Sequence, residues 1–286
     1  MKLATRACPV GRPTDVAGWA RKLDTAVAEA AWAGAELLLF AEYAAMEPAF
    51  GPAPDIQGEI LRAASLGPAL LAAAVVVARR HKIWLMPGTM PWSVEHRTVN
   101  RAHLIAPDGR VAHQDKHVMT RFEAEQWDMA PGPPPSIFTT DWGLVGIATC
   151  FDSEFPTVVR AQVEAGAWLI LVPSCTDTRH GDMRIRIAAR ARAMENQCFV
   201  AVAPTVGAAP WCAAFDTNFG RAAIYGPVDR GFHDTGVVVE GAVDAPGWVF
   251  ADLDPASIEA VRRNGAVRNH LGWPAAIPPC PVVEPA

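Results

Sequence analysis

The apolar run Leu144-Val145-Gly146-Ile147-Ala148-Thr149 ends on Cys150, and Phe151-Asp152-Ser153-Glu154-Phe155-Pro156 follows it directly. The run predicts a buried strand, and the segment after it predicts a turn into a helix. Backbone N–H groups and the dipole at a helix N-terminus favour a thiolate and a developing oxyanion. Cys150 is therefore a candidate nucleophile, while the ordinary alternative for a free cysteine is a small buried hydrophobe.

The alternation of strands and helices extends toward the N-terminus. Residues 2–10 predict a strand, a helix begins at Thr14 or Asp15 and stops at Gly34, and residues 37–40 predict a buried strand. A helix over 59–80, broken near Gly67-Pro68, and a strand over 83–86 follow. Two turns predict hairpins, which pair 99–106 with 111–117 and 137–139 with 144–149.

The C-terminal half repeats this pattern. Helices are predicted over 156–164, 182–195 and 255–263, and strands over 168–172, 199–203, 222–225, 237–240 and 248–253. The mixture of strand-helix-strand units and hairpins predicts an α+β fold, a four-layer αββα sandwich of two mixed β-sheets with helices on the outer faces. Because no long linker interrupts the pattern, we expect a single domain over 1–286 with an irregular C-terminal tail from about 268.

Composition narrows the classes of function. The chain has 286 residues, 51% of them hydrophobic, which excludes a disordered protein. With 25 Lys+Arg against 30 Asp+Glu, no basic field exists to hold nucleic acid or an anionic membrane. The longest apolar run, 66–78, is too short to span a bilayer, and Arg6 interrupts any early signal-like stretch. We therefore expect a cytoplasmic protein with free thiols rather than a disulfide framework.

Two charged residues lie at predicted strand ends. Glu42 directly follows the buried strand 37–40, where open sheets place catalytic groups, and partial burial would raise its pKa toward that of a general base. Lys116 lies at the end of a hairpin strand. Taken singly, each residue is as well explained as an ordinary solvated side chain.

The surroundings of these residues resemble the three signature segments of the nitrilase superfamily of carbon–nitrogen hydrolases. The segments are GAELLLFAE at 34–42, QDKH at 114–117 and GIATCFDSEFP at 146–156. GAWLILVPS at 166–174 and RAMENQ at 192–197 add two further matches, and all five occur in the family's order over roughly residues 1–255.

The resemblance implies a Glu-Lys-Cys triad. Cys150 would be the nucleophile, and Glu42 would take its proton and later give it to the leaving ammonia or amine. Lys116 and the backbone N–H of Phe151 would stabilise the tetrahedral intermediate. An acyl-enzyme thioester would form and water would release the acid, without cofactor or metal.

Further site residues also come from the resemblance. The family often has a second glutamate after the lysine, and we assign it to Glu123, with Glu125 as the alternative. Tyr43, Trp127 and Thr176 are expected to line the substrate pocket. The family often has Asn after the strand that follows the Glu-Asn-Gln segment, but Pro204-Thr205 stands there in this chain, which puts a pocket role in doubt.

The resemblance favours an amide substrate. Nitrilases usually follow the cysteine with Trp-Glu, whereas this chain has Phe151-Asp152. We therefore predict a small-molecule amide hydrolase, with a nitrilase or an N-carbamoyl hydrolase as alternatives. A catalytically inactive scaffold of the same fold is disfavoured because all three triad positions are occupied. A metal site at His113 and His117 is disfavoured because the HExxH pattern is absent, and no histidine stands in the context of a Cys-His protease.

The resemblance also predicts assembly into a homodimer or a larger even homo-oligomer through the outer helices. The helices 156–164 and 182–195 carry more apolar residues than one sheet face needs, namely Val158, Val159, Val163, Met183, Ile185, Ile187 and Met194. The tail 271–286 is expected to lie against the partner. The alternative is that both helices cover only their own sheet and that the tail is loose.

Overall fold

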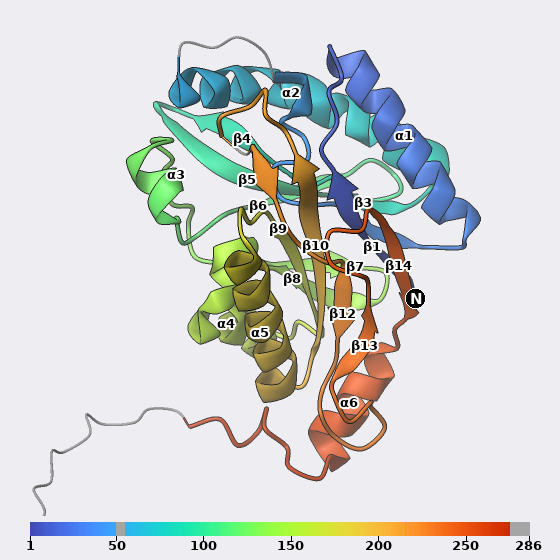
Figure 1. Ribbon diagram of the computed structural model, residues 1–286. Coiled ribbons are helices and arrows are strands. Elements are labelled where there is room, and N and C mark those ends of the chain that lie inside the picture. The colour runs from blue at the N-terminus through green and yellow to red at the C-terminus, as the bar shows by residue number, and fades with distance from the viewer. Residues whose placement is uncertain (50–54, 215, 275–286) are drawn as a thin grey trace, which may run out of the picture.

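Two mixed β-sheets form the centre of the computed structural model, which describes residues 1–49, 55–214 and 216–274 (Figure 1). The first sheet has the strand order β14-β1-β2-β3-β5, with β4 and β6 also paired to β5. Its strands are β1 (Lys2–Pro9), β2 (Leu37–Leu39), β3 (Trp84–Met86), β4 (Thr89–Val94), β5 (Arg97–Ile105), β6 (Val111–Asp115) and β14 (Gly247–Asp252).

The second sheet has the order β13-β12-β10-β9-β8-β7, with β11 on the end of β10. Its strands are β7 (Ile137–Thr140), β8 (Gly143–Ile147), β9 (Leu169–Ser174), β10 (Phe199–Ala208), β11 (Thr217–Asn218), β12 (Ala223–Tyr225) and β13 (Val237–Glu240). The backbones of the two sheets pair where the end of β1 lies beside β10, with Cys8 opposite Thr205 and Pro9 opposite Val206.

Helices cover both outer faces. Helices α1 (Val16–Trp32) and α2 (Ile56–His81) lie against the first sheet, and α4 (Pro156–Glu164) and α5 (Arg179–Asn196) lie against the second, on opposite sides of the molecule in Figure 1. The remaining helical elements are η1 (Glu47–Ala49), α3 (Arg121–Glu125), η2 (Cys150–Glu154) and α6 (Pro255–Asn264).

The strand sequences explain the layers. In β2, Leu37 and Leu39 pack into the core between the two sheets, whereas Leu38 packs under α1 and α2. Because alternate side chains point to opposite faces, a strand buried on both faces must be apolar throughout. In β9, Leu169 likewise packs between the sheets and Ile170 packs under α4 and α5. This arrangement confirms the predicted αββα sandwich.

Helix α1 begins and ends where its sequence predicts. The side chain of Asp15 accepts a hydrogen bond from the backbone N–H of Gly18 at 2.6 Å, which caps the first turn. Its buried stripe includes Trp19, Leu23 and Val27. The helix ends before Gly34, whose φ of +82° lies in the left-handed region that favours glycine.

Helix α2 differs from the prediction, because it runs unbroken through Gly67 and Pro68 over 26 residues. Pro68 lies on the exposed face of the helix, whereas Ala64, whose carbonyl group loses its N–H partner, is buried. Gly67 faces inward, where an added Cβ would lie 2.8 Å from the ring of Trp92 on β4. Packing against α1 and β4 therefore holds the helix together on both sides of the proline.

Helix α2 is also long and apolar enough, by length and composition alone, to cross a membrane, and among the described residues it is the one helix that meets this test. The apolar run 66–78 singled out in the sequence is only the middle part of this helix, which extends past both of its ends. Its residues Leu70, Ala74 and Val77 pack into the core with α1, and core helices of globular proteins meet the same test.

The other predicted elements are present, with small shifts at their ends. Strand β4, which extends the first sheet, and the two-residue strand β11 were not predicted. After α6 the chain continues without regular structure through Pro274, as expected for the tail, and residues 275–286 lie outside the described part of the chain.

Candidate active site

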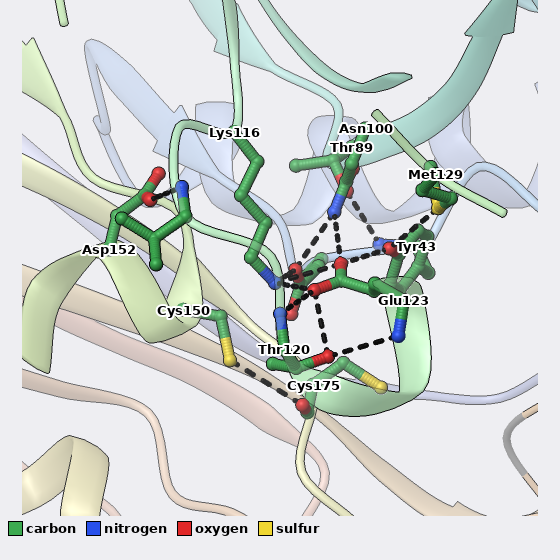
Figure 2. A network of polar contacts seen from close by, with 12 residues as sticks. Tyr43, Thr89, Asn100, Lys116, Thr120, Glu123, Met129, Cys150, Asp152 and Cys175 are labelled. Carbon is green, nitrogen blue, oxygen red and sulfur yellow. Dashed lines mark hydrogen bonds and ion pairs between the residues drawn. The ribbon is translucent and has the colours of Figure 1, made fainter. Parts of the chain in front are cut away.

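Four predicted site residues from four different elements line one cavity, and Figure 2 labels three of them, Lys116, Glu123 and Cys150. Glu42 follows β2, Lys116 follows β6, Glu123 lies in α3, and Cys150 begins η2 directly after β8. All four are almost completely buried, with exposed fractions between 1% and 4%. The first sheet thus supplies Glu42 and Lys116, and the second sheet supplies Cys150.

The ammonium group of Lys116 joins the two glutamates. Its Nζ donates to Glu42 Oε1 at 2.9 Å, and to Glu123 Oε1 at 2.8 Å and Oε2 at 2.7 Å. Burial lowers the pKa of Lys116, but the neighbouring Glu123 and Glu42 outweigh it, so that the pKa lies well above its usual value. The lysine is therefore a fixed cation beside the thiol.

The two glutamates differ in their surroundings. Glu123 also accepts hydrogen bonds from the hydroxyl of Tyr43 and, at 2.9 Å each, from the backbone N–H and the hydroxyl of Thr120. Burial raises the pKa of Glu123, but Lys116 and these donors lower it below its usual value overall. For Glu42 the effect of burial dominates and raises the pKa to about 7 against the opposing effect of Lys116. Glu42 can therefore exchange a proton near neutral pH, whereas Glu123 stays charged.

Cys150 has a strained backbone. Its φ of +47° places a residue with a side chain in the left-handed region, at the sharp junction between β8 and η2. The thiol lies 3.5 Å from the backbone carbonyl oxygen of Cys175, and burial together with Glu42 raises its pKa well above the usual value. The thiol is thus neutral until a base takes its proton. No described residue accepts a hydrogen bond from the backbone N–H of Phe151, which leaves this donor available to a substrate.

Asp152 connects the turn that carries Cys150 to the backbone that follows Lys116. Its buried carboxylate accepts hydrogen bonds from the backbone N–H of His117 at 3.1 Å and of Val118 at 2.7 Å. Burial raises the pKa of Asp152 to about 6, with Lys116 and the backbone donors opposing the rise. Asp152, two residues after Cys150, therefore holds the backbone that follows Lys116 close to the turn that carries the nucleophile.

A cavity of about 610 Å³ opens onto these groups. The predicted pocket residues Tyr43, Trp127 and Thr176 all line it, together with the four residues above and the apolar side chains of Ile56, Phe122 and Phe151. The alternative second glutamate, Glu125, does not line the cavity and instead pairs at the surface with Arg121 at 2.8 Å. Thr205 also lies outside the lining, but its hydroxyl donates to the backbone carbonyl of Glu42 at 2.7 Å.

Three residues of the site were missed from the sequence. Asp152 was noted only as a departure from the nitrilase pattern, and Asn100, which hydrogen-bonds both glutamates, was not considered. Thr120 had a readable signal, because Thr120 and Glu123 form a capping box at the start of α3. No group of three metal-ligating side chains occurs among residues 1–49, 55–214 and 216–274.

The fold and this constellation define a carbon–nitrogen hydrolase. The sequence profile of the carbon-nitrogen hydrolase family matches residues 2–263, so the chain belongs to this family. The resemblance to the nitrilase superfamily noted in the sequence is thereby confirmed.

Individual relatives add detail. The probable hydrolase YhcX of Bacillus subtilis is 32% identical over 193 residues, which cover 68% of this chain and 38% of YhcX. The chloroplastic omega-amidase of Arabidopsis thaliana is 28% identical over 247 residues, which cover 83% of this chain and 63% of that protein. The chain therefore spans less than two thirds of the length of these curated relatives.

Solved structures share the whole fold. A double mutant of the amidase from Nesterenkonia sp. AN1, in complex with acrylamide, has a TM-score of 0.74 and 25% identity, and the match covers 92% of this chain and 94% of that one. Nit3 of Saccharomyces cerevisiae, a member of branch 10 of the nitrilase superfamily, has a TM-score of 0.77 at 18% identity, and the match covers 96% of this chain and 97% of that one.

Proposed function

We propose that this enzyme is an amidase that hydrolyses a small-molecule amide to a carboxylate and ammonia through a thioester on Cys150. The observation that carries the proposal is Lys116 Nζ, which bridges Glu42 and Glu123 in the cavity that Cys150 also lines. A neutral thiol, a carboxylate with a pKa of about 7 and a fixed cation are the three groups that acyl transfer needs.

In the first half of the reaction, Glu42 takes the proton of the Cys150 thiol as sulfur attacks the amide carbon. The carbonyl π electrons move onto oxygen, and Lys116 and the backbone N–H of Phe151 stabilise that oxyanion. The oxyanion then collapses and the C–N bond breaks. Glu42 returns the proton to the leaving nitrogen, so ammonia leaves and a thioester remains.

In the second half, a water molecule attacks the thioester. Glu42 is again unprotonated and takes a proton from the water, and the same two donors stabilise the second oxyanion. Collapse breaks the C–S bond, the carboxylic acid leaves, and the thiolate regains its proton from Glu42. Glu123 stays ionised throughout and holds Lys116 in place.

The preference for amides over nitriles rests on the relatives and on the residues after the nucleophile. The relatives include an omega-amidase and an amidase crystallised with acrylamide. Asp152 accepts backbone N–H groups and so is committed to structure rather than to a nitrile nitrogen. The cavity of about 610 Å³ has room for a substrate considerably larger than acrylamide.

The test is an ammonia-release screen of the purified enzyme across aliphatic amides, aromatic amides, carbamoyl compounds and nitriles. We expect at least one amide to react faster than its matched nitrile and carbamoyl analogue. Cys150→Ala should lose at least about a thousandfold in rate while keeping its fold, because only one sulfur is removed. Cys198→Ala is the matched control, since this buried thiol lies outside the cavity and its loss should leave the rate within about twofold. Turnover within about tenfold of wild type in Cys150→Ala would exclude the thiol mechanism.

A further inference from the structure

Asn100 lies on β5 of the first sheet, and its side chain reaches both glutamates. It is completely buried on β5, and its backbone carbonyl accepts from the N–H of Lys116 at 2.8 Å. Its side-chain Nδ2 donates to Glu42 Oε1 at 2.9 Å and to Glu123 Oε1 at 3.3 Å. Figure 2 shows Asn100 beside Lys116 and Glu123. One amide group thus contacts the two carboxylates that Lys116 also joins.

The chemistry of the partners fixes the orientation of this amide. Ionised carboxylate oxygens only accept hydrogen bonds, so the NH₂ end must face the glutamates. The opposite atom, Oδ1, is buried and has no hydrogen-bond partner among the described residues. An unsatisfied buried carbonyl destabilises the fold. Packing alone would therefore be served better by an apolar side chain of similar size, and the amide needs an explanation in the function of the site.

The hydrogen bonds on Glu42 are unevenly distributed. Lys116 and Asn100 both donate to Oε1, each at 2.9 Å. With two donors on one oxygen, the lone pairs of Oε1 are occupied and Oε2 is the oxygen open to a proton. The carboxylate is also prevented from turning, because its donors come from two different elements, β5 and the end of β6.

We propose that Asn100 is a positioning residue that directs the proton of Cys150 to Oε2 of Glu42 and keeps this carboxylate ready to accept it. The inference rests on the thiol mechanism proposed above. In acylation, the S–H bond breaks, its proton bonds to Oε2 and the sulfur pair forms the S–C bond. In the collapse that follows, the C–N bond breaks and Oε2 returns the same proton to nitrogen, so that Glu42 ends the step ionised.

The other groups around Glu42 do not replace this donor. The titratable side chains that act on it electrostatically, or that it acts on in turn, are Tyr43, Lys116, Glu123, Cys150 and Cys175. Lys116 is the one cation among them, and it is already shared with Glu123. Loss of the Asn100 N–H should therefore raise the pKa of Glu42 further, because one stabilising donor to the ionised form disappears while burial is unchanged.

The experiment is the pH dependence of kcat/KM for Asn100→Leu, which has a similar volume and no donor. We expect the acidic limb of the profile to move up by about one pH unit, since a hydrogen bond to a charged group is worth about that much. The rate should fall about tenfold near pH 6 and return to within about threefold of wild type near pH 9, where Glu42 is ionised in both proteins. KM should change by less than about threefold, because Asn100 does not line the cavity.

Leu104→Ala is the matched control. Leu104 lies on the same strand and packs into the core between the sheets, away from the carboxylates. Its loss should lower thermal stability but leave the acidic limb in place. An acidic limb that stays where it is in folded Asn100→Leu, with an equal loss of rate at every pH, would overturn the proposal and leave Asn100 a purely structural role.

Asn100→Asp is the second variant in case Asn100→Leu does not fold. It keeps the shape of the side chain but replaces the donor by a third carboxyl group, so the acidic limb should move up further than in Asn100→Leu. An unmoved limb, or failure of both variants to fold, would contradict the positioning role. These outcomes are distinct from failure of the thiol mechanism, which would show instead as full activity in Cys150→Ala.

Discussion

Glu42 and Glu123 share one lysine, yet they should respond differently to pH. Burial raises the pKa of Glu42 to about 7, whereas Lys116 and the other donors hold that of Glu123 below its usual value. A general base works only when ionised, so kcat/KM should fall as the pH drops through about 7, by about tenfold for each further unit. Lys116 stays charged over this range because its pKa lies well above its usual value. A kcat/KM profile that stays flat down to about pH 5 would exclude Glu42 as the base.

The second glutamate can be tested with a neighbouring pair. Glu123→Gln removes the fixed anion beside Lys116, so the lysine loses its ion pair with this residue, and kcat/KM should fall by at least about tenfold. Glu125→Gln changes an exposed side chain whose partner is Arg121 at the surface, and should stay within about twofold of wild type. Both variants are measured with the same amide at saturating and limiting concentrations. Equal rates in the two variants would show that neither glutamate supports the lysine.

At the scale of elements, substitutions at two adjacent positions of α2 should change the free energy of unfolding in opposite directions. Gly67→Ala would place a methyl group 2.8 Å from the ring of Trp92, so the free energy of unfolding should fall by about 1–2 kcal/mol despite the better helix propensity of alanine. Pro68→Ala restores a backbone N–H on the exposed face of the same helix and should raise the free energy of unfolding by about 1 kcal/mol or more. Urea denaturation of both variants measures the two changes. A more stable Gly67→Ala would mean that Trp92 moves aside at little cost.

Helix α2 and strand β4 show which parts of the fold could not be predicted from local sequence patterns. Local sequence patterns predicted β2, β9 and α1. A strand made only of apolar residues, or a helix with a capping residue, can be recognised from the sequence of that element alone. The continuity of α2 depends on Trp92, 24 residues after Pro68, and such a contact is not visible in local spacing. Strand β4 was missed because Pro91 interrupts it, and its pairing depends on β5 alone.

The residues of the candidate site also fall into two groups, those that the sequence predicts and those that it does not. Glu42, Lys116 and Cys150 stand in segments with recognisable order and spacing, so their proximity was predictable from the resemblance. Asn100 has no comparable local signal. It lies within the strand β5, and only the pairing of β5 with β6 and the return of the chain through α3 bring its amide to the glutamates.

For the whole molecule, we predict a homodimer through α5. The expectation that α4 contributes apolar surface is wrong, because Val158, Val159 and Val163 are buried. Ile185 on α5, which was expected to add to the same surface, is buried as well. On α5, Met183, Ile187 and Met194 are exposed, Ile187 at 61%, and their spacing places them on one face of the helix. Such a patch is typical of an interface.

Light scattering of the wild type at micromolar concentration should give twice the mass of the chain. Ile187→Glu places a charge in the exposed surface of α5 and should give monomers. Val76→Glu changes an equally exposed apolar residue on α2, at the opposite outer face, and should leave the dimer intact. A monomeric wild type with full activity would rule out this assembly.

The pairing of β1 with β10, which connects the backbones of the two sheets, affects how the enzyme loses activity on heating. β1 and β10 pair there through Cys8 and Thr205, and Thr205 also holds the backbone of Glu42. Glu42 and Lys116 follow strands of the first sheet, and Cys150 follows a strand of the second. Catalytic activity therefore depends on the relative position of the two sheets, even when each sheet is intact. On heating, we therefore expect catalytic activity to be lost at a lower temperature than the strand and helix signals in circular dichroism.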